Sequence, residues 1–193
     1  MLEMIKELSL IGGTSGREEN VRDYIISKLP ETAEYSVDAM GNLLVFAKGK
    51  KPAKNKVMLA AHMDEVGMII TAITSEGFLR FTKVGGIDSR VLLGRAVKVG
   101  DKAVNGVIGI KPVHLVENGQ EADIPKPDDL YIDIGAKSKE EAAEYVRLGD
   151  SAWFDSDFVE FGDGFIKAKA LDDLCAAITS ASLDDVNGDD SNG

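Results

Sequence analysis

The chain has 193 residues and a net charge of −11, from 22 basic and 33 acidic residues. This acidic balance argues against nucleic acid and against an anionic membrane as partners. A single cysteine excludes an internal disulfide framework, and the charged N-terminus lacks the apolar run of a signal peptide, so we expect a reducing, cytoplasmic location. No apolar stretch approaches the roughly 20 residues that cross a bilayer.

The N-terminal region predicts two helices. Apolar residues recur at helical spacing from residue 2 to residue 8, and Gly12 stops that pattern. Ser15 followed three residues later by Glu18 fits a capping box. A second helix is therefore expected from this point to Leu29, before Pro30.

The next segments predict short strands. Residues 37–47 read as a strand pair, and the lysine-rich residues 48–56 as a solvated surface loop. Residues 57–61 form an unbroken apolar run, typical of a strand that is buried on both faces of a parallel sheet. His62 and Asp64 follow its C-terminal end, where ligands bind in open α/β sheets.

A β-rich region follows, in which glycines separate short strand-like segments. Such a density of short strands predicts a small barrel or sandwich. The expected strands are 68–73, 78–83, 96–99, 106–110, 131–134 and 153–161. One helix is expected over 138–148, because Ser138 and Glu141 fit a second capping box. Residues 117–129 read as an exposed loop.

The α/β character returns after the β-rich region. Residues 165–171 predict a strand, Asp172 and Asp173 end it, and a helix-like run begins at Leu174. An inserted domain would produce this order. The boundaries that we expect are α/β core segments over 1–66 and 166–183, an inserted β-rich domain over 67–165, and a disordered acidic tail over 184–193.

Three residues are candidates for chemistry. His62 and Asp64 are two positions apart, so in extended backbone their side chains point the same way and could hold a metal ion. The aspartate could instead orient the imidazole, or the histidine could simply be hydrogen-bonded at a strand end. Asp172 could reach the same crevice and bridge two cations, although paired aspartates also cap helices. His114 has no nearby carboxylate in the sequence and is interpreted as structural.

Five ordered motifs carry a resemblance to a known family. The run from His62 to Gly67 resembles the first metal motif of the M42 metallo-aminopeptidases, the glutamyl or deblocking aminopeptidases, some of which are labelled endoglucanase or cellulase. The run from Lys169 to Asp173 resembles the second metal motif of this family. Three further stretches are similar to its other signatures: 13–19, 106–115 and 130–142.

The resemblance implies an α/β metallopeptidase core with an inserted β-rich, barrel-like domain. It implies that His62 is a ligand of one zinc or cobalt ion, that Asp172 bridges a pair of such ions, and that Asp64 is the catalytic-site acid that supports the histidine. His114 matches a position that is not a ligand. Peptides would be the substrates, cleaved at their N-terminal bond by a metal-activated water. The inserted domain would mediate homo-oligomer formation.

The chain also departs from the family pattern. Members continue with a general-base glutamate, further carboxylate ligands and a final histidine, whereas this chain has no glutamate after Glu160 and no histidine after His114. The core is therefore expected to be incomplete and the sequence truncated or altered near Cys175, with weak metal binding and no activity by the chain alone. The alternative is a non-catalytic self-association module. A third interpretation, a glycoside hydrolase with Asp64 and Asp172 as its carboxylates, is disfavoured by the adjacent histidine.

Overall fold

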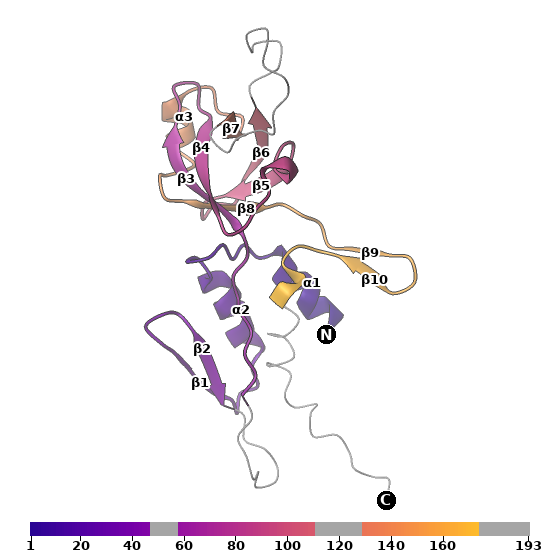
Figure 1. Ribbon diagram of the computed structural model, residues 1–193. Helices are drawn as coiled ribbons and strands as arrows, with labels where there is room; N and C mark the ends of the chain where they lie inside the picture. The colour runs from indigo at the N-terminus through magenta and orange to yellow at the C-terminus, as the bar shows by residue number, and fades with distance from the viewer. Residues whose placement is uncertain (47–57, 111–128, 174–193) are drawn as a thin grey trace, which may run out of the picture. The chain divides into compact units, whose positions relative to one another are not determined.

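The computed structural model describes residues 1–46, 58–110 and 129–173 (Figure 1). The chain divides into two compact units. The first contains residues 1–13, 18–63 and the chain from Phe158 onward, and the second contains residues 14–17 and 64–157. The expected lysine-rich loop, most of the expected loop over 117–129, His114, Cys175 and the acidic tail lie outside the described residues.

The second unit is a closed barrel of six antiparallel strands in the order β3-β4-β7-β6-β5-β8. The strands are β3 (Gly67–Ile73), β4 (Leu79–Val84), β5 (Ala96–Val99), β6 (Val104–Ile110), β7 (Leu130–Asp133) and β8 (Ser151–Phe154). Closure occurs where Met68 of β3 pairs with Ala152 of β8. The predicted barrel-like region is therefore confirmed, and closure leaves the sheet without an edge.

Alternation along the strands fills the barrel interior. Buried residues lie two positions apart within a strand, because successive side chains of a strand point to opposite faces. These residues are Met68 and Ile70 of β3, Leu79 and Phe81 of β4, Val97 and Val99 of β5, and Leu130 and Ile132 of β7. Gly106 takes an interior position in β6, where an added Cβ would lie 2.6 Å from Cγ2 of Ile132. The glycine thus makes room for the isoleucine of the neighbouring strand.

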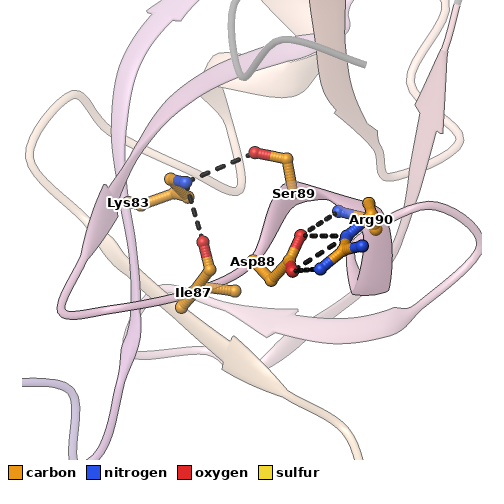
Figure 2. Close-up of polar contacts among 5 residues, drawn as sticks. All are labelled: Lys83, Ile87, Asp88, Ser89 and Arg90. Carbon is orange, nitrogen blue, oxygen red and sulfur yellow. Dashed lines mark hydrogen bonds and ion pairs between the residues drawn. The ribbon is translucent and has the colours of Figure 1, made fainter. Parts of the chain in front are cut away.

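A polar turn lies in the connection between β4 and β5 (Figure 2). The Lys83 ammonium donates to the Ile87 carbonyl oxygen at 2.7 Å and to the Ser89 hydroxyl at 3.3 Å. Asp88 caps the 3₁₀ turn η1 (Ser89–Val91) by accepting from the Arg90 backbone N–H at 2.9 Å. Its carboxylate also pairs with the Arg90 guanidinium, which with the backbone bond lowers the pKa of Asp88 to about 2.

Helix α3 (Lys139–Ala143) packs against the barrel core through Ala142. The Ser138 hydroxyl accepts from the Glu141 backbone N–H at 3.2 Å, so the predicted cap is confirmed. The Glu141 carboxylate, however, accepts from the Lys137 backbone N–H rather than from that of Ser138. The helix is shorter than the expected 138–148, and Val146 reaches the core from the turn that follows it.

The first unit contains two helices, α1 (Leu2–Leu10) and α2 (Glu19–Lys28), whose buried residues are Leu8, Val21 and Ile25. A polar contact links them on the outside. The Tyr24 hydroxyl donates to Glu7, and the Lys28 ammonium lies 2.9 Å from the same carboxylate. Both contacts lower the pKa of Glu7. The helices were predicted, but the expected Ser15 cap is wrong: α2 has Glu18 at its N-cap, and no side chain caps it.

Two hairpins complete the described part of the first unit. Strands β1 (Glu34–Val37) and β2 (Leu43–Phe46) form one, and β9 (Val159–Phe161) and β10 (Phe165–Lys167) form the other. In the first hairpin, the Asp38 carboxylate accepts from the backbone N–H groups of Met40 and Asn42, both at 2.9 Å. A strand pair is present as predicted, but its first strand spans Glu34–Val37 and so lies before most of the expected range 37–47.

Three strand expectations are wrong in detail. Residues 58–61 have no regular secondary structure, and the Met58 side chain is 87% exposed, so this segment is not a buried parallel strand. The expected strand over 153–161 is two strands, β8 and β9, that belong to different units. Strand β10 ends at Lys167, short of Leu171. Apolar runs alone do not show whether a pairing partner is present, which is why these assignments failed. In the part of the chain that the structure describes, no helix is long and apolar enough to cross a membrane.

The inserted domain stays a prediction, and its independence can be measured. A polypeptide of residues 64–157 should unfold in one cooperative transition, because its core lies within this range. Substitution Ile132→Ala should lower its free energy of unfolding by about 2–5 kcal/mol, since the side chain is fully buried. The exposed Val107→Ala should change it little. A featureless urea melt of the parent polypeptide would show that the barrel depends on residues outside this range.

The turn at Asp88 predicts a defined pH dependence. The folded-state pKa of about 2 lies below the ordinary value of 3.8, so the carboxylate stabilises the fold above pH 3.8, and this contribution is lost as the pH falls towards 2. The difference in melting temperature between the parent and Asp88→Asn should therefore be constant above this window and shrink within it. Arg90→Ala should reduce the pH dependence similarly. A difference that stays unchanged from pH 6 to 2 would contradict the assignment.

Candidate functional site

The structure brings His62 and Asp172 together in the first unit. His62 Nε2 lies 3.6 Å from Asp172 Oδ1, so the predicted proximity of these two side chains is confirmed. The expectation that His62 and Asp172 each follow the end of a strand is wrong, because no strand of the described residues ends at either position. His62 lies in an irregular segment, and Asp172 lies in the helical turn Leu171–Asp173, where a cis peptide bond joins it to Asp173.

Packing on the helices positions both segments. Ala61 and Met63, on either side of His62, pack against the cluster of Leu8, Val21 and Ile25. Ala170 packs against the same cluster from the segment before Asp172. The Lys169 ammonium adds a hydrogen bond of 2.6 Å to the Ile11 carbonyl oxygen at the end of α1. Apolar neighbours that share one helical core thus bring the two polar side chains together.

Both polar side chains face outward. The exposed fraction is 51% for the His62 side chain and 98% for that of Asp172. Without a cation, the contact is an ion pair only when the imidazole is protonated. An imidazole nitrogen and a carboxylate oxygen are also the donors that zinc and similar ions bind, and their separation allows both to contact one ion. The pair is therefore chemically suited to be part of a metal centre.

Asp64 belongs to the second unit, where its carboxylate accepts a hydrogen bond from the Ser15 hydroxyl. The neighbouring Thr14 forms a parallel bridge with Glu65, and its hydroxyl donates to the Ala152 carbonyl oxygen at 3.4 Å. Residues 14–17 are thereby fastened to the barrel beside the first metal motif. Sequence reasoning placed Ser15 at a helix cap and missed this role. The sequence does contain a signal for this role. Thr14 and Ser15 form a pair of hydroxyl residues between two glycines, outside any apolar repeat.

The candidate ligand set is partial. Within residues 1–46, 58–110 and 129–173, no group of three or more His, Cys, Asp or Glu side chains could hold a metal ion. A catalytic zinc site uses about three protein ligands. The described residues therefore suit a metal ion in donor type and spacing, but they do not complete its ligand set.

Comparison with known proteins identifies the family. The model of the M42 glutamyl aminopeptidase family matches residues 41–191. This chain belongs to the M42 peptidase family. A putative aminopeptidase of Acetivibrio thermocellus is 41% identical over 94% of this chain and 53% of its own length. The chain spans about half the length of the curated relatives that it matches.

Solved structures of M42-like proteins agree with this assignment. The TET1 peptidase of Pyrococcus horikoshii, which can assemble into a tetrahedron or a large octahedral shell, is 42% identical with a TM-score of 0.81. That alignment covers 93% of this chain and 54% of the other. A Thermotoga maritima protein described as an endoglucanase is 38% identical with a TM-score of 0.77, over 94% of this chain and 52% of its own. Both alignments therefore cover most of this chain and about half of the other protein.

The close packing of Gly67 against residue 14 predicts a matched pair of glycine variants. A Cβ at Gly67 would lie 2.5 Å from Thr14 Oγ1 and 2.6 Å from the Ala152 carbonyl oxygen. Gly67→Ala should therefore lower the free energy of unfolding by about 1–3 kcal/mol. Gly86→Ala is the control, because a Cβ there meets nothing within 4 Å. Equal urea midpoints for the two variants would show that residues 14–17 are not held against β3 and β8.

Proposed function

We propose that this chain carries part of the metal centre of an M42-type aminopeptidase, which hydrolyses N-terminal peptide bonds. The observation that supports this most is the 3.6 Å contact between His62 and Asp172, two side chains far apart in sequence that lie in the two metal-motif segments. Family membership adds the reaction class, because the matching family is one of glutamyl aminopeptidases.

The proposed roles follow from the donor atoms. His62 would hold one divalent ion, zinc or cobalt, through Nε2, and Asp172 would bridge two such ions through its carboxylate. Asp64 would support the histidine, and its own orientation is set by Ser15. Bound divalent ions lower the pKa of a coordinated water and polarise a carbonyl group, which is the chemistry that peptide hydrolysis needs. His62 and Asp172 would hold the ions, and Asp64 would keep the imidazole of His62 oriented.

The 193-residue chain alone is proposed to bind metal weakly and to lack useful turnover. Its described residues offer two ligands where a catalytic zinc site uses about three. The α/β metallopeptidase core is also proposed to be incomplete. Residues 58–61, which were expected to form a buried strand of that core, pair with no strand that the structure describes.

Self-association through the barrel is the second candidate function. The Pyrococcus horikoshii relative assembles into closed shells, and the barrel of this chain has its own complete core. We therefore propose a homo-oligomer. Its proposed location is the cytoplasm, and the net charge of −11 argues against a nucleic-acid or anionic-membrane partner. This function needs no metal and would persist in a chain without activity.

Metal titration tests the first candidate. Co²⁺ added to the 193-residue chain should give a weak absorption change that zinc removes by competition. His62→Ala and Asp172→Ala should each weaken the apparent affinity by tenfold or more, since even loss of an outer partner of a metal ligand costs about 10–100-fold. Asp163→Asn, an exposed carboxylate in the β9–β10 turn, is the matched control and should bind as the parent does.

Activity is measured in the same samples. Aminoacyl-nitroanilides and a cellulose oligomer are offered with zinc or cobalt, and neither should turn over at a useful rate. Clear metal-dependent aminopeptidase activity that His62→Ala abolishes would show that the ligand set is complete after all. Hydrolysis of the cellulose oligomer would favour the glycosidase interpretation, and equal metal affinity in all four proteins would refute the site.

A further inference from the structure

Residues 14–17 are docked on the second unit by contacts that do not involve the Ser15 hydroxyl. The Thr14 side chain is 1% exposed, and its backbone forms a parallel bridge with Glu65. The Ser15 backbone N–H donates to the Glu65 carbonyl oxygen at 3.3 Å. The Arg17 backbone N–H donates to the Thr14 carbonyl oxygen at 2.8 Å and closes a turn. The backbone that carries the Ser15 hydroxyl therefore has a defined position.

The backbone that follows Asp64 is also tightly packed. Gly67 begins β3 and lies so close to Thr14 that a Cβ would meet the Thr14 hydroxyl oxygen at 2.5 Å. On the β4–β5 connection, a Cβ at Gly85 would lie 2.7 Å from Cγ1 of Val66. Close packing of this kind leaves little room for backbone movement. The main freedom that remains at Asp64 is the rotation of its side chain.

The Ser15 hydroxyl limits that rotation, because it donates a hydrogen bond to Asp64 Oδ2. Hydrogen bonds to an ionised carboxylate are stronger than those between neutral groups. Two structural tasks that a hydroxyl could perform here do not use Ser15. No side chain caps α2, and the Thr14 hydroxyl makes the side-chain contact with the barrel, at the Ala152 carbonyl oxygen. The contact of the Ser15 hydroxyl is therefore directed at the carboxylate.

We propose that Ser15 is a positioning residue, whose hydroxyl fixes the Asp64 carboxylate in the orientation that its proposed role requires. This inference rests on the proposed function, in which Asp64 keeps the imidazole of His62 oriented. Ser15 would contact neither metal nor substrate and would act only through Asp64. A site is held in its working geometry when the residues around it are themselves fixed by packing and hydrogen bonds. A hydroxyl suits this task because it donates to the carboxylate without adding a charge.

The test measures which nitrogen of His62 carries the proton, in the 193-residue chain without metal. The chain has two histidines, so long-range ¹H–¹⁵N correlation spectra are simple, and His62→Gln identifies the signal. At about pH 8.5 an ordinary imidazole is neutral, and its tautomer depends on the hydrogen bonds that its nitrogens make. Nε2 lies 3.6 Å from Asp172 Oδ1, which leaves Nδ1 for the proposed contact with Asp64. The ratio of the Nδ1–H to the Nε2–H form therefore reports how well Asp64 is placed.

Asp64→Asn and Ser15→Ala should both lower this ratio, Ser15→Ala by about twofold to tenfold, the range for weakening one hydrogen bond. Ser15→Thr keeps the hydroxyl and should restore the parent ratio. Ser27→Ala is the matched control, because it removes a hydroxyl that bonds only within α2, to the Tyr24 carbonyl oxygen, and it should leave the ratio unchanged. If Ser15→Ala does not fold, Ser15→Cys in reductant replaces the hydroxyl with a weak donor of similar shape and should lower the ratio in the same way.

The outcomes separate this inference from the proposed function. A ratio that Asp64→Asn lowers but Ser15→Ala leaves unchanged would overturn the role of Ser15 and leave that of Asp64 intact. A ratio that Asp64→Asn does not change would overturn the proposed support of His62 by Asp64, and the inference about Ser15 with it. A lowered ratio that Ser15→Thr fails to restore, or that Ser27→Ala also produces, would show a general structural effect and not positioning by the hydroxyl. The measurement needs no metal, so it is decided even if the metal titration shows no binding.

Discussion

Closure of the barrel between β3 and β8 is the constraint on which the rest of the structure depends. The two strands are antiparallel, and Met68 near the start of β3 pairs with Ala152 of β8. The chain therefore leaves the barrel beside the point at which it entered. A domain with neighbouring ends can be inserted into another without separating the segments that flank it. Closure thus pairs the backbone hydrogen-bonding groups at the strand edges of the barrel. It also keeps the ends of the two flanking segments close together.

The candidate metal centre uses this arrangement through packing rather than through strand ends. His62 and Asp172 lie in segments anchored by Ala61, Met63 and Ala170 on one helical core. Asp64, two residues beyond His62, belongs to the second unit, and there it accepts a hydrogen bond from Ser15 of the same unit. The division between the two units falls after Met63, so His62 is counted with the first unit and Asp64 with the second.

The two units differ in how they bury their apolar side chains. The barrel encloses its apolar side chains and caps its β4–β5 connection with the Asp88–Arg90 pair. Among the described residues, the helices of the first unit pack through Leu8, Val21 and Ile25 and are linked by an outer Tyr24–Glu7–Lys28 contact. In its β9–β10 hairpin, the stacked rings of Phe161 and Phe165 are exposed to water.

The sequence by itself determined the features that depend on local pattern. Glycine-separated strands with alternating burial predicted the barrel, helical spacing predicted α1 and α2, and ordered motifs pointed to the family and to His62 and Asp172. Only the tertiary structure decided what depends on partners. Residues 58–61 read as a buried strand, yet they pair with no strand that the structure describes. Ser15 read as a helix cap, yet it binds Asp64 across a long stretch of chain. An apolar run or a hydroxyl limits the kinds of contact that a segment can make. Which partner it contacts depends on the closure and packing of distant segments.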